Sequence, residues 1–267
     1  MKGRVLIAAG SDSGGGAGIQ ADIKAVTALG GYAATAITAL TAQDTHTVHG
    51  IHEVPLDFIR QQMQVVLADI GADAIKTGML HRRGVIEVVA EAVAEHAPGV
   101  PLVADPVMVA KGGARLLDED ATEAAIALLL PLAYVVTPNI PEAEVLSGLE
   151  IADLDGMKRA AEKLKSLGPK AVLLKGGHMS GETLTDLLLT DDGFEAFAGP
   201  RIETAHTHGT GCTTASALAC GLAQGLTLKD AFARARAYVQ EAIRSAPGYG
   251  SGHGPLNHAH TVRPPSP

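Results

Sequence analysis

The segment Thr207-His208-Gly209-Thr210-Gly211-Cys212-Thr213-Thr214 joins a polar, turn-like stretch to an alanine-rich apolar run at residues 215–222. That run predicts a buried helix. Glycine has no Cβ, so the backbone at Gly209 and Gly211 can bend sharply and approach a ligand closely. The first N–H groups of the following helix lack partners within it, and the helix dipole favours negative charge there. The segment therefore predicts an anion-binding loop of the kind that holds a phosphate group.

Cys212 lies in this loop, close to the expected start of the helix. A thiol has a pKa of about 8.5, and a helix N-terminus lowers it. One hypothesis is therefore a reactive thiol beside a bound phosphate. The alternative is a small residue packed at a helix start, and the spacing of the residues does not separate the two.

Outward from this loop, short apolar runs alternate with helical patterns along the chain. The runs predict buried strands at residues 5–9, 32–40, 74–77, 101–104, 134–137 and 171–175. Further strands are expected at 48–54, 185–189 and 195–198, the last two antiparallel and joined at Asp191-Asp192-Gly193. At least five β-α units predict one doubly wound, mostly parallel sheet with right-handed crossovers.

Helices are expected between these strands. The apolar stripes and stop signals place them at about 19–29, 59–70, 85–93, 157–167 and 228–244. Asp120-Ala121-Thr122-Glu123 resembles a capping box that opens another helix, after a loop at 108–117, and a further helix is entered at 138–142. No linker or internal repeat is visible. We therefore expect residues 1–267 to form a single α/β domain, with an irregular C-terminal tail at 248–267.

Composition excludes several classes of function. The net charge is −8, tryptophan is absent and aromatic residues make up 3% of the 267 residues, which argues against nucleic-acid binding. Cys212 and Cys220 are separated by about 12 Å along one expected helix, too far for a disulfide, and neither belongs to a CxxC zinc pattern. This usage indicates a reducing compartment. No apolar run reaches about 18 residues, so neither a signal peptide nor a membrane span is expected.

A second glycine-rich loop, Gly10-Ser11-Asp12-Ser13-Gly14-Gly15-Gly16-Ala17-Gly18, follows the first strand. Strand, glycine-rich loop and helix begin many nucleotide-binding folds. The dinucleotide pattern G-x-G-x-x-G matches only weakly, with Ala21 at its third position, and no acidic partner ends the next strand. The P-loop pattern G-x-x-x-x-G-K-[ST] does not occur in the chain.

Polar residues recur where the expected parallel strands end: Gln43, Asp105, Asn139 and Lys175. Those strand ends share one edge of the sheet, so these residues and the loop 209–212 can line one cleft. Lys175 could neutralise a transferring phosphate, and the loop amides could hold developing negative charge. Oxygen ligands from Asn139, Glu142 and Asp105 suit a hydrated Mg²⁺ ion.

Each of these residues also has a purely structural interpretation. An Asp or Asn after a strand is most often a helix cap or turn former, and a lone lysine there is usually solvated. His46, His49 and His52 lie close in sequence, but no ligand pattern accompanies them. His253, His258 and His260 suit an ordinary tail, and Cys220 suits a small buried residue.

Together, the motifs resemble the hydroxymethylpyrimidine/phosphomethylpyrimidine kinases of thiamine biosynthesis, which have the ribokinase-like fold. The matching stretches run almost from end to end: AGSDS at 9–13, GGAGIQAD at 15–22, TALTAQ at 38–43, KTGML at 76–80, DPVM at 105–108, TPN at 137–139, EAE at 142–144, KGGH at 175–178, THGTGC at 207–212 and GHGP at 252–255. The resemblance implies a three-layer α/β/α architecture in which helices cover both faces of a mostly parallel sheet.

The resemblance further implies ATP-dependent phosphorylation of 4-amino-5-hydroxymethyl-2-methylpyrimidine, and then of its monophosphate to the diphosphate. By this likeness Gln43, Asp22, Gly10, Ala17, Met79 and Val107 bind the pyrimidine. Lys175, Asp105, Asn139 and Glu142 serve ATP, and Asp105 and Glu142 also serve Mg²⁺, partly through water. Gly209, Thr210 and Gly211 form the anion hole, Lys175 assists the transfer, and Cys212 is the base. A cytoplasmic homodimer, without nucleic-acid or membrane partners, is implied as well.

Other interpretations stay open at this point. Sugar kinases of the ribokinase-like fold usually carry Asp where Cys212 stands, and Gly14 replaces a serine that is commoner in the resembled family. A pyridoxal or pyridoxine kinase of the same fold is the nearest alternative, although Gln43 and Met79 favour the pyrimidine. More distant alternatives are acyl transfer by Cys212 and His208, a non-catalytic nucleotide- or precursor-binding regulator, and a dinucleotide oxidoreductase.

Overall fold

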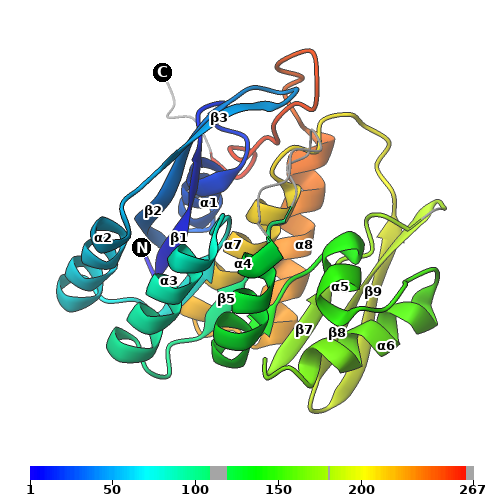
Figure 1. Ribbon diagram of the computed structural model, residues 1–267. Coiled ribbons are helices and arrows are strands. Elements are labelled where there is room, and N and C mark those ends of the chain that lie inside the picture. Colours follow the sequence, from blue (N-terminus) through cyan, green and yellow to red (C-terminus); the bar gives the residue numbers. More distant parts are fainter. Residues whose placement is uncertain (109–118, 180, 263–267) are drawn as a thin grey trace.

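A nine-stranded mixed sheet forms the centre of the molecule in the computed structural model, which describes residues 1–108, 119–179 and 181–262 (Figure 1). The strand order is β3-β2-β1-β4-β5-β6-β7-β8-β9. The strands are β1 (Arg4–Asp12), β2 (Tyr32–Gln43), β3 (Val48–Glu53), β4 (Ala74–Thr77), β5 (Leu102–Ala104), β6 (Val135–Val136), β7 (Ala171–Leu174), β8 (Thr183–Thr190) and β9 (Gly193–Pro200). Six neighbouring strands pair in parallel, in the order β2, β1, β4, β5, β6 and β7. The strands β3, β8 and β9 pair antiparallel with their neighbours, so the expected mostly parallel sheet is confirmed.

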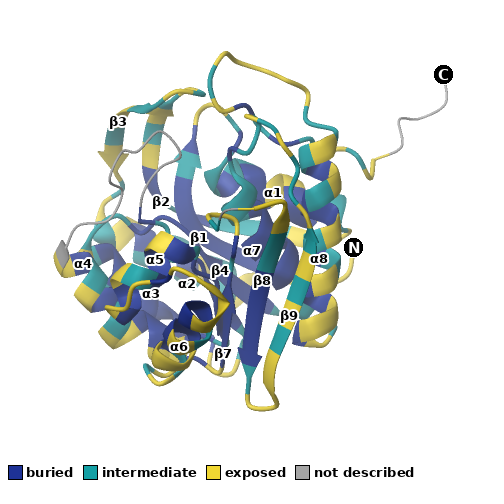
Figure 2. Cartoon of the chain, turned by 90° about the vertical axis from the view of Figure 1, so that its right-hand side faces the viewer, coloured by how far each residue is buried: buried dark blue, intermediate teal, exposed yellow. Residues whose placement is uncertain are grey.

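Helices cover both faces of this sheet. They are α1 (Gly18–Ala28), α2 (Leu56–Asp69), α3 (Arg83–His96), α4 (Glu119–Ala124), α5 (Ile140–Ser147), α6 (Leu154–Lys165), α7 (Thr210–Ala223) and α8 (Leu228–Arg244). On one face α2 to α6 pack in a single apolar cluster, and on the other α1, α7 and α8 pack in a second one. Alternate residues of β1 divide between the clusters, with Leu6 in the first and Ile7 in the second, as the period of a strand requires. Figure 2 shows the buried strands between these two helical layers.

Two local expectations need correction, and a third falls almost entirely outside the described residues. β2 continues through Gln43 rather than ending at residue 40, because Thr41, Ala42 and Gln43 pair with the antiparallel strand β3. Asp120 does not cap a helix, because it already lies inside α4 (Glu119–Ala124). The loop expected at 108–117 lies, apart from Met108, outside the described residues.

The C-terminal segment 248–262 has no named helix or strand, yet it is not an ordinary tail. Pro255 forms a parallel bridge with His208, and Leu256 is only 4% exposed. His258 is buried, and its Nε2 lies 3.0 Å from the hydroxyl of Thr213 on α7. Burial lowers the pKa of His258 to about 4, so its ring is neutral at physiological pH. The segment therefore braces the loop before α7.

The strand order reverses at β1, which has β2 on one side and β4 on the other. In an open parallel sheet, ligands bind at the carboxyl ends of the strands beside such a reversal. The glycine-rich loop after β1 and the N-terminus of α7 lie at this point. Among the described residues, no helix is both long and apolar enough to cross a membrane.

Candidate active site

A cavity of about 670 Å³ opens at the carboxyl ends of the parallel strands. All but one of the residues expected at the site line it: Gly10, Ala17, Gln43, Met79, Asp105, Val107, Asn139, Glu142, Lys175, Gly209, Thr210, Gly211 and Cys212. Asp22 is the exception, because its side chain is fully buried beneath the cavity. The structure thus brings the expected polar strand ends and the anion-binding loop together.

Apolar residues form one wall of this cavity. Met79 packs against Ala39, and the partly buried Val107 packs against the same pair. Gly10 makes room for this wall, because a Cβ at Gly10 would lie 2.6 Å from Met79 Cε. These side chains give the cavity an apolar surface on this side.

We expect Gly10→Ala to weaken binding of a ring-shaped substrate at least tenfold, because the new methyl group pushes the flexible Met79 side chain into the cavity. The effect should appear in KM, or in Kd by calorimetry, with little change in the melting temperature. A matched change at Gly50, where a Cβ would meet nothing within 4 Å and φ is not positive, tests the cost of a methyl group alone. An unchanged Kd for Gly10→Ala would contradict this packing.

Asp12 organises the loop after β1. Its carboxylate accepts hydrogen bonds from the backbone N–H groups of Gly14 (2.8 Å), Gly16 (3.0 Å) and Ala17 (2.8 Å). It also pairs with His208, whose Nε2 lies 2.9 Å from Asp12 Oδ2. Burial raises the pKa of Asp12, but these hydrogen bonds outweigh it and hold that pKa below its ordinary value. Sequence reasoning gave Asp12 no role, because the residues that it holds in place are far apart in the chain.

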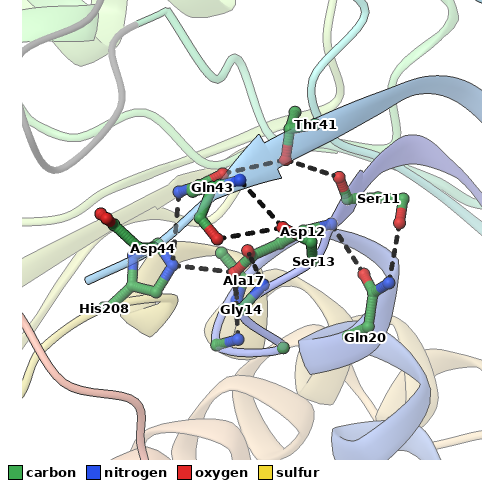
Figure 3. A network of polar contacts seen from close by, with 12 residues as sticks. Ser11, Asp12, Ser13, Gly14, Ala17, Gln20, Thr41, Gln43, Asp44 and His208 are labelled. Atoms are coloured by element: carbon green, nitrogen blue, oxygen red, sulfur yellow. Dashed lines mark hydrogen bonds and ion pairs between the residues drawn. The ribbon is translucent and has the colours of Figure 1, made fainter. Parts of the chain in front are cut away.

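Figure 3 shows how this network reaches Gln43. The side chain of Gln43 extends between Thr41, whose Oγ1 lies 3.2 Å from Gln43 Oε1, and His208, whose Nε2 lies 3.5 Å from Gln43 Nε2. Its backbone is tied to Ser13, which accepts from Gln43 N (2.8 Å) and donates to Gln43 O (3.0 Å). The loop after β1 and the loop before α7, together with Thr41 of the same strand, therefore fix this residue at the cavity.

The N-terminus of α7 has the geometry expected of an anion-binding loop. Gly209 is the N-cap residue, with φ 81° and ψ 7°. A Cβ at Gly209 would lie 1.8 Å from the carbonyl oxygen of Gly16, so only glycine fits. Thr210 is tied back, since its hydroxyl donates to Thr207 O (2.8 Å). By helix geometry the amides of Gly211 and Cys212 then have no acceptor within the helix and are left for a ligand.

Cys212 is half-buried at this helix start, but its thiol is not acidified as expected. Burial is the largest influence and raises the pKa of Cys212 to about 11. The positive charge of Lys76 opposes this rise, and the carboxylates of Asp22 and Asp105 add to it. The expectation of a lowered pKa was therefore wrong, because dense packing around the sulfur outweighs the helix N-terminus.

Lys175 and its partners form the polar floor of the cavity. Lys175 Nζ lies 2.9 Å from Asp105 Oδ1, which also accepts from the Thr137 hydroxyl (3.0 Å). Burial lowers the pKa of Lys175, but Asp105 and Glu142 hold it above its ordinary value. Burial raises the pKa of Glu142 to about 7, so this carboxyl lacks full compensation for its charge. An uncompensated buried carboxyl beside Asp105 fits a site for a divalent cation.

Asn139 has the structural role that its position after a strand predicts. It is the N-cap of α5, where its side chain accepts from Glu142 N (3.0 Å) while Glu142 Oε2 accepts from Asn139 N (2.9 Å). This capping box holds Glu142 at the edge of the cavity. Asn139 therefore has a structural role as a helix cap, and a contact with a ligand would be a second role.

At the base of the cavity, Lys76 on β4, which lines it, and Asp22 on α1, which does not, form a fully buried ion pair, with Lys76 Nζ 3.0 and 2.9 Å from the two carboxylate oxygens. Ser216, one turn after Cys212 on α7, donates to Asp22 Oδ1 (2.7 Å). Burial lowers the pKa of Lys76, but the neighbouring charges, Asp22 first, raise it above its ordinary value. The sequence did contain a signal for such a pair, because a lysine within a short apolar strand is buried and needs a counter-charge.

Lys76→Met is expected to lower the free energy of unfolding by about 3–5 kcal/mol, because it leaves the Asp22 carboxylate buried without a counter-charge. Chemical denaturation measures this loss. The double variant Lys76→Met/Asp22→Asn should recover much of it, since no unpaired charge remains. A double variant as unstable as Lys76→Met would contradict the importance of the pair.

The far end of the cavity was not foreseen. Its lining includes Val239, Gln240 and Ile243 of α8. Asp186 closes this end, where it accepts from Gly176 N (3.0 Å) and pairs with Arg236 (3.2 Å). These residues carry no motif, and only the packing of α8 beside β8 brings them to the cavity.

Comparisons with known proteins identify the family to which the chain belongs. The family model for phosphomethylpyrimidine kinase matches residues 12–257. The chain is 47% identical over 256 residues to the hydroxymethylpyrimidine/phosphomethylpyrimidine kinase of Bacillus subtilis, covering 96% of this chain and 94% of that protein. It is 52% identical over 257 residues to the thiamine biosynthesis bifunctional protein ThiED of Geobacter sulfurreducens, covering 96% of this chain but only 52% of that longer protein.

Among solved structures, the pyridoxal kinase of Staphylococcus aureus in complex with AMP-PCP and pyridoxal superposes with a TM-score of 0.90. The two chains are 35% identical, and the match covers 98% of this chain and 96% of the other. The ribokinase-like, three-layer fold implied by the sequence is confirmed. From the family model and from relatives matched over nearly its whole length, the chain is a member of the phosphomethylpyrimidine kinase family.

Proposed function

We propose that the chain phosphorylates the hydroxymethyl group of 4-amino-5-hydroxymethyl-2-methylpyrimidine with ATP, and then phosphorylates the monophosphate to the diphosphate, as a step in thiamine biosynthesis. The observation that carries this proposal is the convergence of Gln43, Lys175 and the loop 209–212 on one cavity. The names and the near full-length coverage of the relatives support it.

The cavity has a part suited to each portion of the reactants. Gln43 offers donor and acceptor groups to the pyrimidine edge, and Gly10, Ala17, Met79 and Val107 enclose its ring. Asp22 acts from below, through its ion pair with Lys76, rather than by contact with the ring. The loop 209–212, through the unpaired amides of Gly211 and Cys212, receives the transferring phosphoryl group, and the ammonium of Lys175 offsets its charge.

ATP and Mg²⁺ belong to the Lys175 end of the cavity in this proposal. The S. aureus kinase was crystallised with AMP-PCP, which supports a nucleotide donor. Asp105 and Glu142 would hold the ion, partly through water, and Asn139 keeps Glu142 in place through the capping box. When bound, Mg²⁺ supplies positive charge that offsets the phosphate oxygens.

Cys212 serves as the base for the first phosphorylation. An alcohol must lose a proton to attack, whereas a phosphate monoester, with a second pKa of about 6, is largely ionised at neutral pH. The Cys212 sulfur lies at the start of α7, beside the amides that receive the phosphoryl group. The first step therefore depends on the thiolate form, and the second does not.

This assignment predicts different pH profiles for the two acceptors. Because the pKa of Cys212 is raised to about 11, the thiolate fraction increases with pH throughout the neutral range. We expect kcat/KM for the alcohol to rise roughly tenfold per pH unit from about pH 7 to about pH 9. The monophosphate should give a nearly flat profile over that range, and it serves as the internal control. An alcohol profile that levels off by about pH 9 would show a thiol of ordinary or lowered pKa, which has a value of about 8.5 or less.

A pyridoxal kinase activity is the second candidate, and the S. aureus structure favours it, since that enzyme was solved with pyridoxal. Pyridoxal also presents a hydroxymethyl group on a flat heteroaromatic ring. We further propose a cytoplasmic homodimer. The family resemblance supports the dimer, and the two free thiols support a reducing compartment.

The direct test is release of ADP from ATP and Mg²⁺ with four separate acceptors: the hydroxymethylpyrimidine, its monophosphate, pyridoxal and ribose. Turnover of both pyrimidines, with little turnover of the others, supports the proposal. Turnover of pyridoxal alone moves the assignment to the second candidate. A chain that turns over none of the four is not the kinase proposed here.

A further inference from the structure

The carboxamide of Gln43 has two polar neighbours whose hydrogen positions are fixed by other contacts. Thr41 and Gln43 are two residues apart on β2, so both side chains lie on the same face of the strand. The other neighbour, His208, comes from the loop before α7. Figure 3 shows both against the Gln43 side chain. Together they determine whether the oxygen or the NH₂ group of the carboxamide faces each neighbour.

Thr41 can only accept a hydrogen bond from Gln43. A threonine hydroxyl carries one proton. Thr41 Oγ1 lies 2.9 Å from the carbonyl oxygen of Ser11, which has no proton to give, so the Thr41 proton is used there. The lone pairs of Thr41 Oγ1 therefore face the carboxamide of Gln43, 3.2 Å away.

His208 cannot accept a hydrogen bond from Gln43. Its Nε2 lies 2.9 Å from Asp12 Oδ2, and the pKa of Asp12 is held below its ordinary value, so that oxygen is an ionised acceptor. His208 Nε2 must then carry a proton in either the neutral or the charged ring. This N–H group lies 3.5 Å from the carboxamide nitrogen.

We propose that Gln43 meets its ligand with its carboxamide oxygen toward His208 and its NH₂ group toward Thr41, and that these two are positioning residues that select this orientation. With Oε1 on the Thr41 side, two acceptors face each other there, and two N–H donors face each other at His208. A half-turn about the Cγ–Cδ bond exchanges the two ends: the NH₂ group then donates to Thr41 Oγ1, and the carboxamide oxygen, rather than a second donor, faces the protonated Nε2 of His208. That torsion is soft in glutamine, whereas Ser13 holds the backbone from both sides.

The orientation determines which hydrogen-bond donor and acceptor of Gln43 a ligand meets on each side. This step rests on the proposed function. Gln43 then offers an acceptor on the side of His208 and a donor on the side of Thr41. The substrate edge has the complementary pair, an exocyclic amino donor and a ring-nitrogen acceptor, as adenine offers to glutamine. Its amino group would lie on the His208 side. The hydroxymethyl group is on the adjacent ring carbon, so it is directed toward residues 209–212, which follow His208 directly.

The same order of donor and acceptor makes the site selective. The 4-oxo analogue of the substrate carries an oxygen acceptor and a ring N–H donor, which is the reverse pattern. A freely turning carboxamide could match either ring, but one held by Thr41 and His208 can match only the amino form. Selectivity therefore depends on two residues that need not touch the ring themselves.

Nuclear magnetic resonance of the free protein tests the orientation without any ligand. The side-chain NH₂ signals of Gln43 are assigned by their loss in Gln43→Glu. We expect NOEs from these protons to the methyl group of Thr41. NOEs to the ring protons of His208, without any to Thr41, would overturn the inference whatever reaction the chain catalyses.

Calorimetric binding of the amino and 4-oxo rings to the full chain tests the selectivity. The wild type should prefer the amino ring, and Thr41→Val should reduce the Kd ratio roughly tenfold or more, while Thr41→Ser keeps it. Thr35→Val, the same change on β2 away from the cavity lining, should leave the ratio intact. Equal weakening of both rings by Thr41→Val would overturn the positioning role. A wild type that binds neither ring would overturn the proposed function and, with it, the substrate part of this inference.

Discussion

Replacing Cys212 with alanine should slow phosphorylation of the alcohol roughly 10²–10⁴-fold, the usual effect of losing a general base, and slow phosphorylation of the monophosphate far less. The reason is the state of each acceptor, since the hydroxymethyl group holds its proton at neutral pH and the phosphate monoester does not. The sulfur is well placed for this role, because it shares the cavity with the phosphoryl-binding amides of α7.

Single-turnover rates with each acceptor at saturating ATP give the two effects separately. Cys220→Ala is the matched control, because it makes the same change on the same helix at a buried thiol outside the cavity lining. It should leave both rates near those of the wild type. An equal loss in both steps for Cys212→Ala would assign the thiol a positional role and contradict its role as base.

Lys175→Met should reduce kcat roughly 10²–10³-fold for both acceptors, the usual effect of losing one group that stabilises charge in the transition state. Lys175 offsets the charge of the transferring group, which is common to the two steps. The change also leaves Asp105 without its 2.9 Å partner, so some loss of thermal stability is expected. Rates at saturating substrate, with the melting temperature recorded in parallel, separate the two effects.

Lys170→Met provides the control, because Lys170 is exposed just before β7 and Lys175 follows that strand's end. It should leave both rates unchanged. A Lys175→Met enzyme that loses only the alcohol step would resemble Cys212→Ala. It would show that Lys175 acts on the attacking hydroxyl rather than on the phosphoryl group.

Much of the fold could be predicted because the buried elements have strong local signals. The last helix was expected at 228–244, which is where α8 lies, since its apolar stripe begins after the Thr227 cap and runs to Arg244. The end of β2 could not be predicted, because residues 41–43 are polar or exposed and remain extended only through pairing with β3. Asp120 shows a similar limit, since a capping pattern inside a helix has the same letters as one at its start.

The sequence was sufficient to place those residues of the candidate cavity whose position depends only on the end of one strand. Gln43, Asp105, Asn139 and Lys175 were placed at one edge by topology alone, and all four line the cavity. The features that could not be predicted depend on burial and on partners that are far apart in the sequence. The raised pKa of Cys212 follows from packing that no motif encodes, and the pairs Lys76–Asp22 and His208–Asp12 join residues that are 54 and 196 positions apart.

The central claim is that one cavity carries out two successive phosphorylations. A ³¹P NMR time course, started from the unphosphorylated hydroxymethylpyrimidine with ATP and Mg²⁺, tests it most directly. We predict a monophosphate signal that rises first and then gives way to the paired signals of the diphosphate. A monophosphate that accumulates to completion, with no diphosphate even after fresh ATP is added, would contradict the claim.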